Sequence, residues 1–408
     1  MMTEHKQKLV PAIRFNAFTD TWEQRKLSDV ADYYDGTHQT PKYTDEGVKF
    51  ISVENIKNIW ESDKYISEND YEKQFKIKPQ INDIFMTRIT AGVIGDTALV
   101  EQDDPLAYYV SLALIRPKSI VPLYLEKYIN SPFFKNELHI RIIHTAFPKK
   151  INLGDIGKCG VKMPNSKKEQ VQIGEFFKQF DNLIFLHQRK LDGLVTLKDG
   201  FLQQMFPAAN EVIPRVRFAG FTGNWEKRRL EEMLTERNEQ FEESEDYPLM
   251  SFVGNVGVVP KGEQYDRSFL VKGDGKKYKK TELNDFIYSS NNLETGSIGL
   301  NRTGKAVISP VYSIFYSSND SESLFVGLLS KRKDFINKMI HYRQGVMYGQ
   351  WRIHERDFLK IIVLAPTISE QNRIIDFFKN FDEQIAAQTA KLEQLRQLKA
   401  AYIQRMFI

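Results

Sequence analysis

Several short stretches approach known catalytic motifs, but each lacks a group that the chemistry requires. The segment 299–306, GLNRTGKA, is close to the phosphate-binding pattern GxxxxGK[ST]. Ala306 stands where that pattern needs a hydroxyl to hold Mg²⁺, and the residues after it are typical of a strand, not a helix. The segment NSPF at 130–133 is close to the Asn-Pro-Pro-aromatic loop of amino-methyltransferases, but it has a single proline and no glycine-rich cofactor segment before it. We therefore expect Ser131 and Pro132 to begin a helix.

Metal and nucleophile chemistry have no support in the sequence either. The seven histidines show no HxxxH or HExxH spacing, and no GxSxG elbow occurs. Cys159 is the only cysteine, which excludes a disulfide within the chain and fits a reducing, cytoplasmic setting. No run of 18 apolar residues could span a membrane, and the N-terminus has no apolar signal core. We expect a chain that is not an enzyme and that binds no metal or cofactor itself.

Polar, basic and aromatic residues gather instead in loops, as expected of a surface that binds nucleic acid. Lysine and arginine bind phosphates, whereas arginine, asparagine and glutamine have paired hydrogen-bonding groups that fit base edges. The predicted base readers are Arg88, Asn291, Arg302 and Gln350. The full set of predicted contacts in the first half is Thr37, His38, Thr40, Lys42, Tyr43, Thr87, Arg88, Thr90, Lys149 and Lys150. In the second half it is Lys276, Lys277, Lys279, Lys280, Ser289, Ser290, Asn291, Asn292, Arg302, Lys305, Tyr348, Gln350 and Arg352.

The charge balance leaves this interpretation open. A net charge of +4 is compatible with an anionic partner but is too small to establish one. For any single lysine among residues 276–280, a solvated surface position is an equally good interpretation.

Two elements that must position these loops occur twice in the chain. The stretch 169–206 returns as 370–407, so that Phe176 corresponds to Phe377. The opening segment 14–27 returns as 217–230, and Trp22 and Trp225 are the expected core anchors. The chain is therefore two copies of one module, each of which begins with an aromatic segment and ends in a long helix.

The apolar residues of each long stretch follow steps of three and four, which predicts a coiled-coil seam. At ~1.5 Å per residue each helix would be about 57 Å long. The alternative is that each helix packs on its own domain. The predicted seam of the first helix is Ile173, Phe176, Phe180, Leu183, His187, Lys190, Leu194, Leu197 and Phe201. The predicted seam of the second is Ile374, Phe377, Phe381, Gln384, Gln388, Lys391, Leu395, Leu398 and Tyr402.

Between these shared ends, glycine turns and short apolar runs predict a mixed α+β module. KFISVENI reads as a buried strand, and GKCGVKMP and LKIIVLAP read as the final strands of the two copies. The expected organisation is a leader at 1–13, domains at 14–165 and 211–367, and helices at 166–210 and 368–408.

The order module, helix, module, helix resembles the specificity (S) subunit of type I restriction-modification systems. The likeness covers essentially the whole chain and rests on the openings RFNAFTDTWEQRKL and RFAGFTGNWEKRRL, the loop GTHQTPKYTDEGVKFISVENI and the paired helices. The second module departs from the pattern, with SEDYPLMSFVGNVG where Thr40 and Pro41 have no clear counterpart. The resemblance implies an α+β fold with two target recognition domains, a spacer of two long antiparallel helices and a pseudo-two-fold repeat.

That resemblance also implies a function and partners. The chain would read a bipartite, asymmetric DNA site, one half with each domain, without catalytic activity of its own. Its implied partners are double-stranded DNA, modification (methyltransferase) subunits, expected as a pair, and restriction subunits. S-adenosylmethionine would be bound by the modification subunits, and ATP and Mg²⁺ by the restriction subunits. The assembled complex would be a DNA adenine methyltransferase and an ATP-dependent endonuclease.

The helices would set the unread gap between the half-sites and dock the modification subunits. We expect His187 and Gln388 to face each other at the centre and fix the register, because a buried polar pair disfavours other alignments. Lys178, Lys198, Lys379 and Lys399 are expected on the outer faces, free for docking. Two alternatives remain: a two-headed scaffold that binds proteins, and an enzyme that acts on DNA alone.

Overall fold

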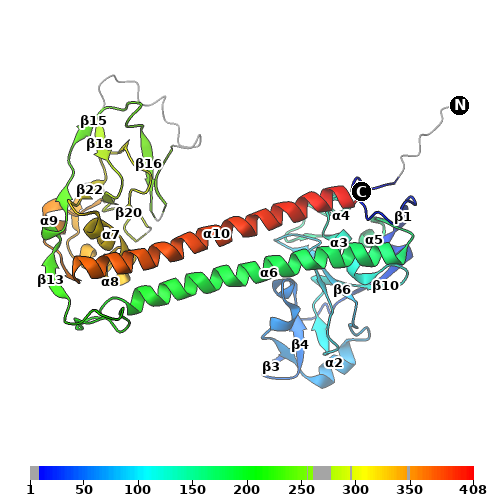
Figure 1. Cartoon of the computed structure of the whole chain (residues 1–408). Coiled ribbons are helices and arrows are strands. Elements are labelled where there is room, and N and C mark those ends of the chain that lie inside the picture. Colours follow the sequence, from blue (N-terminus) through cyan, green and yellow to red (C-terminus); the bar gives the residue numbers. More distant parts are fainter. Residues whose placement is uncertain (1–8, 255, 261–276, 295, 347–349) are drawn as a thin grey trace. The chain divides into compact units, whose positions relative to one another are not determined.

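The structure is a computed structural model that describes residues 9–254, 256–260, 277–294, 296–346 and 350–408. It divides into unit 1, with Met1–Arg189 and Ala390–Ile408, and unit 2, with Lys190–Thr389. Two long helices, α6 (Lys167–Gln204) and α10 (Ile368–Met406), are each divided between the units (Figure 1). Both helices were predicted, and their limits lie within two residues of the repeated stretches 169–206 and 370–407, although α6 ends six residues before the limit of 210 expected for the first helical region. The units differ from the expected separate domains and helices, because each half-helix packs with a globular part.

Unit 1 combines small β-sheets with short helices. Its central antiparallel sheet has the order β2 (Ala31–Asp35), β10 (Leu112–Pro117), β6 (Ile84–Thr87) and β8 (Thr97–Leu99). A second sheet has the order β3 (Tyr43–Thr44), β5 (Tyr65–Ile66), β4 (Val48–Ile51) and β9 (Leu106–Tyr108), in which β4 and β9 are parallel. Strand pairs join β1 (Glu23–Lys26) to β12 (Gly160–Met163) and β7 (Ile89–Thr90) to β11 (Lys149–Lys150). The helices are α1 (Leu27–Val30), α2 (Glu68–Gln74), α3 (Pro122–Ile129), α4 (Pro132–His139) and α5 (Leu153–Gly157), with 3-10 turns at Val53–Asn55 and Ile59–Glu61.

Unit 2 repeats this plan with differences in its outer strands. Its central antiparallel sheet has the order β14 (Thr235–Glu236), β22 (Ser313–Tyr316), β19 (Phe286–Tyr288) and β20 (Ile298–Leu300). A three-stranded sheet has the order β15 (Gln240–Phe241), β18 (Tyr278–Thr281) and β21 (Ala306–Ile308). Strand pairs join β13 (Glu226–Arg229) to β25 (Ile362–Ala365), β16 (Met250–Val253) to β17 (Gly257–Pro260), and β23 (Gln344–Val346) to β24 (Gln350–Arg352). The helices are α7 (Asp320–Leu329), α8 (Lys333–Ile340) and α9 (Glu355–Leu359), with a 3-10 turn at Leu230–Glu232.

The central sheet of each unit is apolar on both faces. In β6, Ile84 and Met86 belong to one hydrophobic cluster and Phe85 to another. In β19, Phe286 and Tyr288 face one cluster and Ile287 faces a second. Successive side chains of a strand point to opposite faces, so a strand covered on both sides reads as a continuous apolar run.

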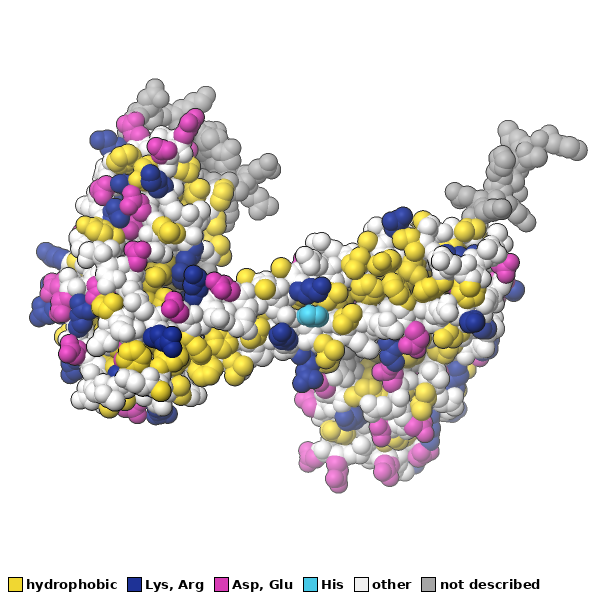
Figure 2. Space-filling view, in the orientation of Figure 1, with side chains coloured by type: hydrophobic (Ala, Val, Ile, Leu, Met, Phe, Trp, Pro, Cys, Tyr) yellow, Lys and Arg dark blue, Asp and Glu magenta, His cyan; other side chains and the backbone are white. Residues whose placement is uncertain are grey.

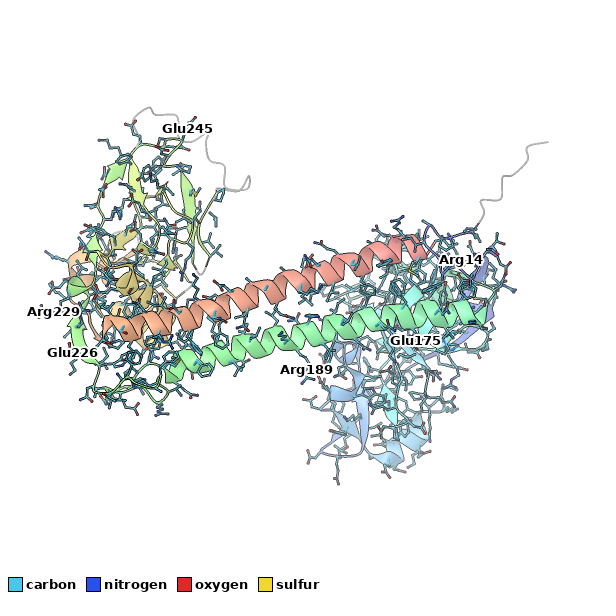
Figure 3. The ribbon with its side chains drawn as sticks, viewed as in Figure 1. Arg14, Glu175, Arg189, Glu226, Arg229 and Glu245 are labelled. Atoms are coloured by element: carbon cyan, nitrogen blue, oxygen red, sulfur yellow. The ribbon has the colours of Figure 1, made fainter. Side chains whose placement is uncertain are left out.

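In each unit the opening segment is bonded to the start of a long helix, α6 in unit 1 and α10 in unit 2. Arg14 donates two hydrogen bonds to the buried carboxylate of Glu169, at 2.6 and 2.8 Å, and lies beside the start of α6 (Figure 3). Arg217 binds Glu370 in the same way, at 2.7 Å for both bonds. The strand near the end of each opening segment pairs with the final strand predicted for the same copy. These pairs are β1 with β12 and β13 with β25. The predicted frame is therefore confirmed, including the burial of Trp22 and Trp225.

The core of each unit also receives the end of the other copy's helix. Phe407, at the end of α10, packs on Tyr124, Tyr128 and Phe177 in unit 1. Phe206, after α6, packs on Trp225, Phe325 and Phe378 in unit 2. Residues 9–13, part of the expected leader, are also tied to unit 1 by backbone hydrogen bonds from Trp22 to Leu9 and from Ile13 to Arg405.

Within each unit the two half-helices pair antiparallel, as predicted. In unit 1, Phe176 and Phe180 pack against Tyr402, and Lys399 donates a hydrogen bond to Asp181. The equivalent contacts in unit 2 join Phe201 to Phe377 and Phe381, and Lys198 to Asp382.

The predicted line of seam residues is wrong along part of both helices. Leu183, Leu197 and Leu398 were placed in the seam but are 45%, 56% and 47% exposed. Lys198 and Lys399 were placed on the outer faces but lie in the seam, paired with aspartates. The prediction took steps of three and then four residues from Phe180, whereas the structure takes four and then three. The seam therefore contains Ile184, Leu191 and Lys198 in place of Leu183, Lys190 and Leu197. Leu194 and Phe201 keep their predicted places, because the seven-residue repeat itself is unchanged.

The other seam predictions show the same pattern, in that Lys190 is exposed and Leu191, one position later, is half-buried. Gln384 and Lys391 are exposed, whereas Leu392 is buried one position later. His187 is half-buried in unit 1 and Gln388 is buried in unit 2. Their pairing across the seam stays a prediction.

Candidate nucleic-acid interface

Asp35, at the end of β2, connects two of the predicted contact loops of unit 1. Its carboxylate lies 3.0 Å from Nε2 of His38 and accepts a hydrogen bond from Arg88. Arg88 also donates to the backbone carbonyls of Val110, at 3.2 Å, and Ile151, at 3.3 Å. The guanidinium is therefore buried, with Nε and Nη1 engaged in hydrogen bonds, and a base contact by these two nitrogens would require the bonds to break.

The third predicted loop of unit 1 joins the same region through β7 and β11. Lys149 pairs with Thr90, and Lys150 pairs with Ile89. Both lysine side chains are exposed and available for phosphates. Thr87 is buried and its hydroxyl donates to the carbonyl of Val93 at 2.8 Å, which gives it a turn-holding role.

The remaining residues of the first loop extend onto the second sheet. Thr40 and Lys42 are exposed, and Tyr43 in β3 lies edge-on to Phe50, with 5.7 Å between ring centroids. Thr37 forms an isolated bridge with Tyr109, which ties the loop to the core. The structure thus gathers the three predicted loops of unit 1 around the ends of β2 and β6.

Unit 2 forms the corresponding surface with amide and hydroxyl groups. Oδ1 of Asn291 accepts the backbone N–H of Trp351 at 2.6 Å, and Oγ of Ser290 accepts that of Ile353 at 2.9 Å. These bonds bring the loop after β19 to β24, which contains Gln350 and Arg352. Ser289 is buried in this loop, whereas Asn292 is exposed.

Glu355 supplies a carboxylate at the edge of this surface. It lies 3.5 Å from Arg352 and 3.9 Å from Lys279, and accepts a hydrogen bond from Ser313 at 2.8 Å. Burial alone would raise the pKa of Glu355, but hydrogen bonds from its backbone N–H and Ser313, with the nearby cations, hold that pKa below its usual value. The carboxylate therefore stays ionised and neutralises part of the positive charge.

The predicted lysines of unit 2 are mostly engaged. Lys280 lies 3.1 Å from Glu239 and 3.2 Å from Glu282, and Lys305 lies 5.5 Å above the Tyr247 ring. Lys277 is exposed. Lys276 and Tyr348 lie outside the described residues.

Arg302 does not join the surface around Asn291. It lines a cleft together with Lys331 and Asp382. Its predicted contact with a base stays untested, and the geometry gives it a different neighbourhood from the other predicted base readers.

Two exposed aromatic side chains beside these loops were not predicted as contacts. Phe147, before β11, is 96% exposed, and Trp351, in β24, is 49% exposed. Their positions, two residues before Lys149 and between Gln350 and Arg352, were the available sequence signal, since bases stack readily on aromatic rings. Asp35 was missed as well, and its place directly before the glycine of the first loop was the signal there.

Three further observations concern surface charge, metal-ligand geometry and membrane-spanning helices. Figure 2 shows acidic and basic side chains interspersed on the visible face of each unit. In the described part of the chain, no group of three or more His, Cys, Asp or Glu side chains could hold a metal ion. No helix among the described residues is long and apolar enough to cross a membrane.

Comparison with known proteins identifies relatives of both repeats. The family model of the type I restriction modification DNA specificity domain matches twice, at residues 19–195 and 222–397. The type I restriction-modification S subunit from M. genitalium aligns over 98% of this chain and 99% of its own, with a TM-score of 0.64 and 13% identity. A chain from a structure of the assembly and conformational transition of the type I R-M system aligns over 95% of this chain and 97% of its own, with a TM-score of 0.53 and 14% identity. A search of curated protein sequences found no match.

Proposed function

The chain belongs to the family of type I restriction-modification DNA specificity subunits, which are non-catalytic, and we propose that each of its units reads one half of a bipartite, asymmetric DNA site. The observation that carries this proposal is that the two units share a frame but differ at the equivalent surface. Unit 1 has Lys149 and Lys150 there, exposed, with Arg88 buried behind them, whereas unit 2 has Asn291 and Trp351. Two surfaces of different hydrogen-bonding chemistry would select different bases.

Phosphates and bases would be bound by different residues of these surfaces. Lys149 and Lys150 are exposed and would bind phosphates, which positions the duplex without selecting a sequence. Phe147 and Trp351 would pack against bases or sugars next to them. Arg88 would contact a base after its hydrogen bond to Asp35 breaks. Otherwise it would keep that bond and hold the loop whose other residues contact the base.

The catalytic work would belong to partner subunits. In this proposal, modification subunits bind S-adenosylmethionine and methylate adenine, and restriction subunits use ATP and Mg²⁺ to translocate and cut DNA. Docking would use the exposed outer faces of α6 and α10, which carry Leu183, Phe185 and Leu186 on α6. It would not use Lys198 and Lys399, because these are paired in the seam.

Helix length would set the unread gap between the half-sites. α6 has 38 residues and α10 has 39, which corresponds to about 57 Å of helix at ~1.5 Å per residue. One turn of B-DNA is about 34 Å, so two reading surfaces so held would reach separate major-groove segments.

A salt titration tests the proposal against protein scaffolding. Binding of the complex with modification subunits to duplex DNA should weaken by about 10³-fold or more between 50 and 200 mM salt, because phosphate contacts release counterions. The subunit without its partners should bind DNA weakly and with little sequence preference. Binding that ignores salt, or tight specific binding by the subunit alone, contradicts the proposal.

A further inference from the structure

A cleft occurs at the same place in both units, but with different chemistry. In unit 1 it has a volume of about 210 Å³, and in unit 2 about 1110 Å³. The unit 1 cleft is lined by Glu126, Lys127, Asn130, Phe177, Asp181, Lys399 and Ile403. Residues 201 positions away, Gly327, Leu328, Lys331, Phe378, Asp382, Lys198 and Leu202, all line the cleft of unit 2.

Backbone hydrogen bonds confirm this correspondence. The N–H of Ser131 bonds the carbonyl of Tyr128, as that of Arg332 bonds Leu329. The N–H groups of Val100 and Asn301 bond the carbonyls of Asp83 and Asp285, respectively. Asn130 therefore corresponds to Lys331, and Glu101 corresponds to Arg302.

In unit 1, carboxylates of the chain itself neutralise the lysines in and beside the cleft. Asp181 accepts hydrogen bonds from Lys127, at 2.7 Å, and from Lys399. Glu126 accepts from Asn130 at 2.8 Å. Beside the cleft, Lys178 donates to Glu101 at 2.8 Å. Each lysine here has a carboxylate partner.

Unit 2 has lost two of these three carboxylates. Arg302 stands at the position of Glu101, and Gly327 at the position of Glu126, while Lys331 replaces an asparagine. Asp382 remains, bound by Lys198 and 3.8 Å from Lys331. Within the described part of the chain, no ion pair holds Arg302.

Other acidic side chains around this cleft do not restore the balance. Glu294 is bound by Arg343 at 2.7 and 2.6 Å, and Glu383 lies 4.0 Å from Lys379. Asp199 is exposed at the rim. Lys198, Arg302 and Lys331 are thus three cations that line the cleft with one remaining carboxylate, Asp382.

We propose that the unit 2 cleft binds an acidic segment of a polypeptide partner, whose carboxylates neutralise Arg302 and Lys331 as the chain's own carboxylates neutralise the lysines in unit 1. The carboxylate chemistry follows from unit 1, where the same cradle is completed within the chain. A polypeptide fits because the cleft is far larger than one anion and has apolar lining beside its cations, including Leu202, Ile298 and Leu328. The proposal rests on the two clefts and not on the DNA-reading function.

The protonation of Lys331 fits this assignment. Its pKa is lowered to about 8, chiefly by burial, with Asp382 opposing this shift and Lys198 and Arg302 adding to it. Lys379, Glu383, Glu294 and Asp199 are the other charged groups that line the cleft. A bound carboxylate would raise this pKa again, so binding should weaken as the pH rises through about 8.

The test measures the fluorescence anisotropy of a fluorescein-labelled peptide of glutamate and leucine with the full-length chain. Lys331→Asn and Arg302→Glu give the cleft the residues that unit 1 has, and each should lower the affinity at least tenfold. Lys333→Asn is the matched control, because Lys333 is exposed and lines no part of the cleft. It should bind the peptide as the unaltered chain does, and thermal melting should show all variants folded.

Three results would overturn the proposal. The first is absence of peptide binding, or equal binding of a peptide with glutamine in place of glutamate. The second is unchanged affinity in both Lys331→Asn and Arg302→Glu. The third is a loss of duplex-DNA affinity in Lys331→Asn that matches the loss of peptide binding, since these cations would then serve phosphates. Lys331→Asn should leave DNA affinity unchanged, which separates this proposal from the proposed function.

Discussion

Buried arginine–glutamate pairs hold the frame of each unit at the scale of single residues. Arg14 and Glu169 join segments 155 positions apart through two charge-assisted hydrogen bonds, and Arg217 and Glu370 repeat the arrangement. The bond to Glu169 raises the pKa of Arg14, so the guanidinium stays charged. Removing one partner of a buried pair leaves the other charge unpaired.

Arg14→Ala should therefore destabilise unit 1 by about 3–5 kcal/mol, because it leaves the carboxylate of Glu169 buried without its partner. Chemical denaturation followed by limited proteolysis measures the free energy of unfolding and identifies the unit that opens first. Arg217→Ala is the matched control and should open unit 2 first. A loss below about 1 kcal/mol would show that water replaces the arginine at little cost.

Lys149 and Lys150 should contribute affinity without sequence preference. Replacing both with alanine should lower the slope of log affinity against log salt by about 2 for the complex on duplex DNA, since each phosphate contact contributes about 0.9. The recognised sequence should stay the same. An altered sequence with an unchanged slope would instead place these lysines at base edges.

At the scale of elements, the long helices were predictable, and their seam was predictable only in part. Length, the absence of proline and the repeat in sequence sufficed for α6 and α10. The prediction failed at every second seam position after Phe180, because it took steps of three and then four residues where the structure has four and then three, and so Leu183 was chosen instead of Ile184. The positions of Lys198 and Lys399 failed for the same reason.

Shortening both helices by one heptad should narrow the unread gap. Deletion of Gln188–Leu194 and Thr389–Leu395 removes about 10 Å of helix, roughly three base pairs, while it preserves the seam. Mapping of methylated sites should show both half-sites retained with a shorter gap. An unchanged gap would mean that the helices do not set the distance.

For the whole molecule, internal comparison was the strongest source of prediction. The repeat predicted the shared frame because it relies on local apolar spacing and on residues such as Trp22 and Trp225 that occur in both copies. It could not show that each unit takes the helix end of the other copy, as Phe206 and Phe407 do. Sequence spacing does not reveal which core a distant segment completes.

The contact surfaces were predicted only in part. The loops were located correctly in the chain, but the roles of their residues depend on neighbours that are distant in sequence. From the sequence, Arg88 was interpreted as a side chain free to contact a base. In the structure it is hydrogen-bonded to Asp35 and to two backbone carbonyls. Arg302 was grouped with Asn291, yet it lines the cleft beside Lys331.

The measurement that tests the central claim most directly is a genome-wide map of methylated adenines in cells that produce the complex. It compares the unaltered chain with Arg88→Lys in unit 1 and Asn291→Asp in unit 2, each of which removes a pairing geometry suited to one base. The account predicts a bipartite site in which each variant relaxes or alters only one half and leaves the gap and the other half unchanged. A single continuous site, or variants that change both halves together, would contradict it.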